Sequence, residues 1–351
     1  MDKAAKQGRG RRTAVLMTAA GVLFVLFLVS LTLGRYSVPL SEVIRILVHK
    51  LWTLVGLDRI WPMRVTWTQF MENAVINVRF PRIVMAVLVG CSLSAAGATF
   101  QGVFRNPMAS PDILGASNGA AFGAALAILL GCSTRYITIF AFVGSLFTVA
   151  LVFLIAQHAS GLKTVNLILA GIMVGSLFSA GTSYLKLVAD PSDQLPAITY
   201  WLMGSLSGVR LAHILPATIP MAVGLIPLLL LRWRLNLLSL GDSEARALGV
   251  NTDLLRAVLI LCATLVTAAA ISVSGVIGWV GLVVPHLSRK LIGSDNRGLL
   301  PCSMLFGGAF LLLADDVSRN LLATEIPIGI LTAVIGAPFF VYLLLRKEKT
   351  L

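Results

Sequence analysis

Ionisable side chains that could do chemistry are scarce in this chain and gather in a few short stretches. Asp315, Asp316, Arg319 and Glu325 follow one another in LADDVSRNLLATE, near the ends of two apolar segments. Ionisable groups beside a bilayer are costly to hold and often mark an ion or substrate path. Acids and an arginine three or four residues apart on one helix can equally pair with each other. The sequence leaves both interpretations open.

Motifs for covalent or metal chemistry are absent from the sequence. No G-x-x-x-x-G-K-[ST] phosphate loop occurs, so the chain is not expected to hydrolyse ATP. There is no HExxH motif, and no set of histidines and acids at metal-ligand spacing lies in the apolar segments. The four cysteines lack CxxC spacing, and we interpret them as small buried side chains. We predict that the chain is not an enzyme and binds no metal or cofactor.

Two polar stretches interrupt the apolar chain. RNPMASPDILGASNGA, residues 105–120, contains two prolines that prevent a helix from running through it. It fits either a solvated turn with Asp112 as a helix N-cap or a functional site. RWRLNLLSLGDSEARALGVNTDLLR, residues 232–256, holds a short helix candidate with Asp242 as N-cap and Gly249 as terminator. That helix could enter a groove of another protein or belong to an ordinary loop.

Composition indicates which elements must carry these stretches. The 351 residues are 57% hydrophobic and 12% charged, with a mean hydropathy of +0.90. The apolar residues come in blocks of about 20, the length of a helix that crosses the hydrocarbon core. We predict an all-α polytopic membrane protein with about ten transmembrane helices in a single domain, residues 1–351. The predicted spans are 14–33, 79–102, 113–131, 136–157, 164–188, 212–233, 253–274, 276–292, 299–314 and 326–345.

The distribution of Lys and Arg predicts the orientation. The net charge of +13 is not gathered on one face or arm, which argues against a nucleic-acid partner. If the N-terminus is cytoplasmic, the short outer loops hold only Arg135, Lys186, Arg210 and Arg319. The positive-inside rule then places both termini in the cytoplasm.

The segment 35–78 is predicted to lie on the outer, periplasmic side of the membrane. In SVPLSEVIRILVHKLWTLVGL, apolar residues recur at helical spacing after Pro39. We predict an amphipathic helix that lies on the membrane surface in contact with lipid. The rest of the chain, 79–346, is predicted to form the core bundle, in which many small residues let helices approach closely.

Five stretches resemble the FecCD-type permeases, the ABC importer subunits for iron-siderophores, haem and vitamin B12. They are VRFPRIVMAVLVGCSLSAAGATFQGVFRNPMASPDILGASNGA, YWLMGSLSGV, LGDSEARALGV, GWVGLVVPHLSRKLIGSDNRGLLP and LLLADDVSRNLLATEIPIGILTAVIGAPFFVYLLLRK. The resemblance implies the fold of the vitamin B12 importer permease, in a bacterial inner membrane. It also implies a second permease subunit, two separate ATPase subunits that hold ATP and Mg, and an extracytoplasmic substrate-binding protein.

The same resemblance assigns roles to three sets of residues. A cytoplasmic gate is implied for Asn106, Met108, Leu162, Lys163 and Thr164. A coupling helix near 241–249, held in a groove of the ATPase, is implied for Asp242, Ser243, Glu244, Ala245, Arg246 and Leu248. Docking of acidic residues of the binding protein is implied for Arg79, Arg82 and Arg319.

The resemblance implies ATP-driven alternating access, with an iron-siderophore complex as the commonest cargo. Haem and cobalamin permeases share every one of these motifs and stay open, as does the choice between a homodimer and a heterodimer. An ion-driven secondary transporter would need paired intramembrane acids and unwound spans, and a channel would need repeated polar residues along a pore. Neither pattern is apparent in the sequence.

Overall fold

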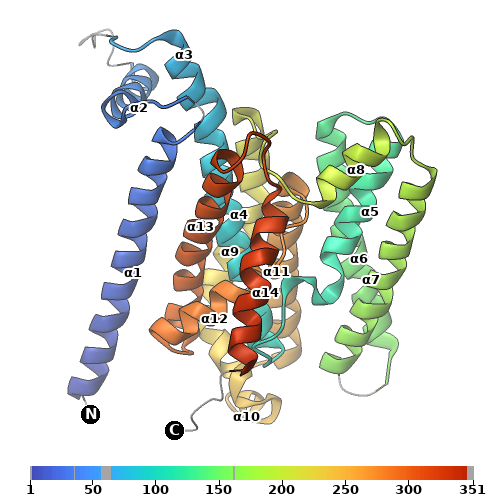
Figure 1. Ribbon diagram of the computed structural model, residues 1–351. Helices are drawn as coiled ribbons and strands as arrows, with labels where there is room; N and C mark the ends of the chain where they lie inside the picture. Colours follow the sequence, from blue (N-terminus) through green and yellow to red (C-terminus); the bar gives the residue numbers. More distant parts are fainter. Residues whose placement is uncertain (1, 35, 57–64, 161–162, 346–351) are drawn as a thin grey trace.

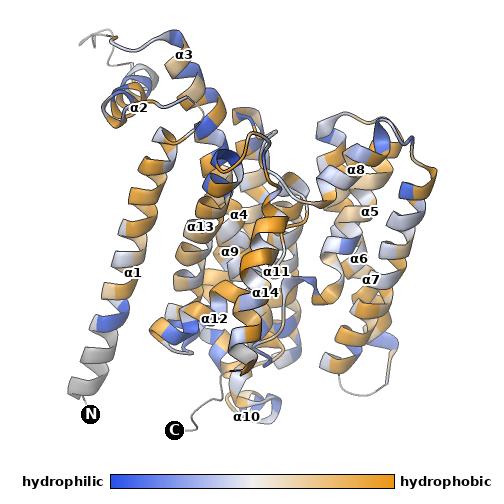
Figure 2. Cartoon of the chain, in the orientation of Figure 1, coloured by the Kyte–Doolittle hydropathy of each residue, from blue (hydrophilic) through white to orange (hydrophobic). Residues whose placement is uncertain are grey.

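The chain folds as an upright bundle of helices (Figure 1). The computed structural model describes residues 2–34, 36–56, 65–160 and 163–345, and within these ranges every regular element is a helix. Apolar residues run along the long helices, and polar residues are more frequent toward their ends (Figure 2). The predicted all-α membrane fold is confirmed.

Each of the ten predicted spans coincides with a helix. Seven of the described helices are long and apolar enough to cross a membrane, and α5 and α14 are shorter apolar helices. In chain order the ten are α1 (Asp2–Thr32), α4 (Phe80–Val103), α5 (Ala116–Leu129), α6 (Thr134–His158), α7 (Lys163–Val188), α9 (Leu211–Leu240), α11 (Thr252–Ser274), α12 (Val280–Ile292), α13 (Asn296–Asn320) and α14 (Ile328–Leu345).

The remaining elements are short and lie between these helices. The helix α2 (Leu40–Leu54) occupies the predicted position of the amphipathic helix. It is followed by α3 (Gln69–Glu72) and the π-helix η2 (Asn73–Arg79). The other short elements are the 3₁₀ helix η3 (Pro111–Leu114), α8 (Gln194–Leu202) and α10 (Asp242–Ala247). The start of α1, the end of α14 and α10 lie at one end of the bundle, and α2 and α3 at the other (Figure 1).

Two predicted boundaries are wrong for identifiable reasons. The span predicted at 79–102 begins at Gln69, because α3 and η2 continue into α4 without a break. The span predicted at 276–292 is helical only from Val280, because Gly275 ends α11 with a φ of +69°. The 13 residues of α12 rise about 20 Å, less than the hydrocarbon thickness of about 30 Å.

Small residues bring the central helices together at backbone distance. The helix α4 is buried along most of its length and packs against α9, α11, α12 and α13. A Cβ atom on Gly97 would lie 1.8 Å from the carbonyl oxygen of Gly281 on α12. A Cβ atom on Gly90 would lie 2.2 Å from the carbonyl oxygen of Gly307 on α13. Helices α5 to α8 form a second group, joined to the first where α6 packs on α11 (Figure 1).

Gly97→Ala should destabilise the bundle, because its methyl group would push α4 and α12 apart. Overpacking of this kind costs about 1–3 kcal/mol and should lower the midpoint of thermal unfolding in detergent. Gly21→Ala on α1 is the matched control, since nothing lies within 4 Å of its Cβ position. Equal midpoints for the two variants would contradict the close contact.

Candidate functional site

A buried network of charged side chains joins α4 to α13 at the end of the bundle that carries α2. Arg82 Nε donates to the two carboxylate oxygens of Asp315 at 2.9 and 3.1 Å. Its Nη1 donates to the carboxylate of Glu325 at 2.8 and 3.0 Å. Asp315 is fully buried and Glu325 is partly exposed. Because packed helices hold no bulk water, each of these charges depends on its partner.

Two further arginines of this network hold the end of α1. Arg319 Nη2 donates to the carbonyl and hydroxyl oxygens of Ser30, each at 2.7 Å, and pairs with Asp316. Ser30 Oγ donates to Asp316 at 2.7 Å. Arg79 donates to carbonyl oxygens at the end of α1 and in the turn after it, those of Leu31, Thr32 and Tyr36. The arginines thereby satisfy acceptors that a helix end leaves unpaired.

The structure changes how the predicted docking residues must be interpreted. The side chains of Arg79, Arg82 and Arg319 are buried, and Arg82 and Arg319 already have acidic partners within the chain. Pairing between Asp316 and Arg319 was one of the two interpretations of the sequence. The pairing of Arg82 with Asp315 was missed, since no local pattern links residues on different helices. Docking through these three arginines stays a prediction.

Two residues of the predicted gate, Asn106 and Met108, lie in the connection between α4 and α5, and the other three lie at or just before the start of α7. Asn106 Oδ1 accepts a hydrogen bond from the backbone N–H of Met108 at 2.9 Å, and both side chains are exposed. Thr164 lies in the first turn of α7. Leu162 and the side chain of Lys163 lie outside the described residues. The gate role of the five residues stays a prediction.

Asp112 does not cap α5, contrary to one interpretation of the sequence. The N-cap residue of α5 is Gly115, with a φ of +73°, and Asp112 belongs to η3. The carboxylate of Asp112 instead accepts a hydrogen bond from the hydroxyl of Ser117. Asp112 also lies at the edge of a cavity between η3 and α7.

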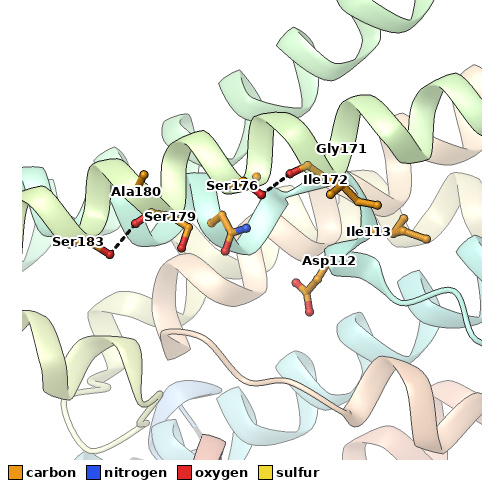
Figure 3. Close-up of a pocket in the computed structure, with 10 residues that line it drawn as sticks. Asp112, Ile113, Gly171, Ile172, Ser176, Ser179, Ala180 and Ser183 are labelled. Carbon is orange, nitrogen blue, oxygen red and sulfur yellow. Dashed lines mark hydrogen bonds between the residues drawn. The ribbon is translucent and has the colours of Figure 1, made fainter.

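A polar cavity of about 590 Å³ lies between η3, α5 and α7. Hydroxyl, amide and carboxylate groups line it together with two isoleucines, two glycines and an alanine, so polar and apolar groups contribute about equally (Figure 3). Ser176 and Ser183 donate to carbonyl oxygens of their own helix, at 2.8 and 3.0 Å, so their oxygens remain as acceptors toward the cavity. The lining residues are Asp112, Ile113, Asn118, Gly171, Ile172, Gly175, Ser176, Ser179, Ala180 and Ser183.

The short helix α10 is tied to α11 by two ion pairs. Asp242 accepts a hydrogen bond from Arg256 at 2.8 Å, and Arg246 donates to Asp253 at 3.2 Å. Asp242 was predicted as the N-cap, but it is the first helical residue and Gly241 is the N-cap. These pairs fix the position of α10 relative to a long buried helix.

The outward surface of α10 is free for another molecule. Glu244 is exposed and Leu248 is 62% exposed, whereas Ala245 is fully buried beneath them. Hydrogen bonds from its own backbone N–H and from the Ser243 hydroxyl hold the pKa of Glu244 below its usual value. The carboxylate is therefore ionised at neutral pH, as the ATPase-coupling prediction requires.

Near the same end of the bundle, a polar cluster that the sequence did not reveal joins α1, α9 and α13. Asp295, the N-cap of α13, accepts hydrogen bonds from Arg12 at 2.5 Å and from Asn236 at 2.8 Å. Burial would raise the pKa of Asp295, but these bonds and the backbone N–H of Arg297 outweigh it and lower the pKa. The only local signal was an aspartate before a helix.

Asp315→Asn should destabilise the protein strongly, because Arg82 would stay charged with one buried carboxylate fewer. Breaking a buried ion pair costs about 3–5 kcal/mol, measured as a fall in the thermal unfolding midpoint. Glu42→Gln on α2 is the control, since Glu42 pairs with the half-exposed Arg45 at 3.0 Å and such pairs contribute about 0–1 kcal/mol. Similar falls in both variants would contradict the importance of the network.

Comparison with known proteins agrees with this architecture. A profile of the FecCD transport family matches residues 22–346. The molybdate import permease MolB of Haemophilus influenzae is 40% identical over 328 residues, 93% of this chain and 94% of that protein. An iron chelatin transport permease of Helicobacter pylori is 43% identical over 274 residues, 78% of this chain and 83% of that protein.

A solved structure has the same fold. It is described as an inward-facing conformation of a metal-chelate type ABC transporter. It matches with a TM-score of 0.83 and 38% identity, over 95% of this chain and 99% of that one.

Proposed function

The chain belongs to the FecCD transport family and is a permease subunit of an ABC importer; on this premise we propose that it carries an iron-siderophore complex across the bacterial cytoplasmic membrane. Its partners in this proposal are a second permease subunit, two ATPase subunits that hold ATP and Mg, and an extracytoplasmic binding protein. Both termini face the cytoplasm.

The polar cavity beside α7 supports the choice of cargo. Its volume of about 590 Å³ is within the usual range for sites that bind small molecules. The serine hydroxyls and the Asn118 amide can hydrogen-bond the oxygen-rich surface of a chelate. The carboxyl group of Asp112 adds a further hydrogen-bonding group to this surface, and it does not discriminate a chelate from the molybdate named for the Haemophilus relative. Haem and cobalamin remain the alternative cargoes.

Coupling to the ATPase is proposed to run from α10 to the gate. The cavity is bordered by η3, in the connection that holds Asn106 and Met108. A Cβ atom on Gly241, the N-cap of α10, would lie 2.2 Å from Glu244 Oε2 and 3.8 Å from Arg105 Nη1. Arg105 of the same connection therefore reaches α10. A displacement of α10 by the ATPase would therefore act on the connection directly.

Docking of the binding protein is proposed at the opposite end of the bundle. Arg82 becomes available there only if the connection that carries Glu325 moves away, because Glu325 binds Arg82 Nη1. Charge reversal of Arg79, Arg82 or Arg319 would disrupt the buried network along with any docking. Loss of docking in such a variant would thus need a separate measurement of folding.

Glu244→Lys combined with Arg246→Glu should abolish co-purification of the ATPase subunit with the tagged permease. The reversed charges would oppose those of the ATPase groove. Because Arg246 also binds Asp253, the single variant Glu244→Lys leaves that pair intact and should weaken association severalfold. Glu42→Lys with Arg45→Glu, at the other end of the bundle, is the control. Unchanged association of both α10 variants would remove the coupling role.

Transport itself is tested with a deletion strain and its complemented parent. Uptake of labelled ferric siderophores, haem, cobalamin and molybdate is compared with and without depletion of ATP. Loss of ATP-dependent siderophore uptake alone is the expected outcome. Loss of another uptake in place of it would overturn the cargo, and ATP-independent transport would overturn the mechanism.

A further inference from the structure

The helix α2, which the sequence places on the membrane surface, presents an exposed apolar stripe that the cavity and the predicted coupling and docking sites do not use. Val43 and Ile46 are buried against the rest of the chain; the partly buried Leu47 lies between them and the stripe on one flank, and Arg45 and Glu42 lie on the other. At 100° per residue, the side chains of the stripe fall within one narrow sector of the helix. They are Leu40, Ile44, Val48, Leu51 and Val55, all exposed.

A second exposed apolar surface lies on α1. Val22, Val25, Val29 and Leu33 are exposed on one side of α1, and Tyr36 is exposed in the turn that leads to α2. Among the seven helices able to span a membrane, α1 has the smallest share buried within the chain, 17%. An apolar helix so little covered by protein must be covered by lipid. Since α2 lies across the end of α1 (Figure 1), it sits at the level where the apolar length of α1 ends.

The basic groups of α2 are already paired with acids. Arg45 binds Glu42 at 3.0 Å, and Lys50 lies 4.0 Å from the carboxylate of Glu72. Thr66 donates to Glu42 at 2.8 Å, so this polar side is tied to the segment that leads to α3. Attraction of such a helix to anionic headgroups is weak, and apolar burial has to provide the affinity.

We propose that the stripe on α2 is embedded in the outer leaflet of the bilayer, at the boundary of headgroups and acyl chains. Its partner is the hydrocarbon of the lipid and not a specific headgroup. The helix thereby sets the depth at which the end of α1 and its bound arginines, Arg79 and Arg319, sit in the membrane. This proposal is independent of the cargo and of the ATPase.

Photo-crosslinking tests which molecule covers the stripe. p-Benzoylphenylalanine is placed at Ile44, at Leu51 and, as the control on the polar side of the same helix, at Arg45. Phe24, an exposed ring on α1, is the positive control for contact with lipid. Full-length protein in native membranes is irradiated, and adducts are identified by mass spectrometry. Lipid adducts at Ile44 and Leu51 should exceed those at Arg45 severalfold and approach those at Phe24.

The same variants are then irradiated in nanodiscs of phosphatidylcholine, with and without phosphatidylglycerol. Equal lipid adducts in both are expected. Adducts that require phosphatidylglycerol would overturn hydrocarbon burial in favour of headgroup binding. Adducts with a binding protein or with a second copy of the chain, or no lipid preference for Ile44 and Leu51 over Arg45, would overturn the proposal. Having two sites on α2 guards against one variant failing to fold.

Discussion

A charged group packed among helices must be neutralised by a partner inside the protein, and this requirement organises one end of the molecule. Arg82 and Arg319 face Asp315, Asp316 and Glu325, whereas Arg79 is held by carbonyl oxygens at the end of α1 and in the turn after it. These groups come from α1, η2, α4 and α13, from the turn after α1 and from the connection that carries Glu325. The mutual positions of α1, α4 and α13 therefore follow from electrostatic satisfaction as much as from apolar packing.

Ion pairs between residues far apart in the chain could not be predicted from the sequence. Hydropathy and helical periodicity predicted the ten helices, since both depend on neighbours a few residues apart. The pairing of Asp316 with Arg319 was within reach for the same reason. The pairs of Arg82 with Asp315 and of Arg12 with Asp295 join residues more than 200 positions apart, and their geometry emerges only after the helices have packed.

Two predictions of helix N-caps from local sequence were wrong. Asp112 and Asp242 look like helix N-caps, yet a glycine precedes the helix at both places, and each aspartate binds a side chain instead. The break predicted between the spans 253–274 and 276–292 is longer than expected, because residues 275–278 are not helical and α12 begins only at Val280. The polar cavity was invisible in the sequence, because serines spaced along α7 look like ordinary helix-packing residues until Asp112 is seen opposite them (Figure 3).

The backbone contact between Gly97 and Gly281 restricts how the bundle can rearrange. A slip of α4 along α12 by one turn would bring the side chain of Leu93 or Gln101, four positions away on the same helix face, to the carbonyl oxygen that Gly97 now approaches. Stepwise sliding at this contact is therefore blocked in both directions. The two helices travel as one rigid body, and any change of shape during a transport cycle has to take place at looser boundaries, such as that between the group α5 to α8 and the central helices.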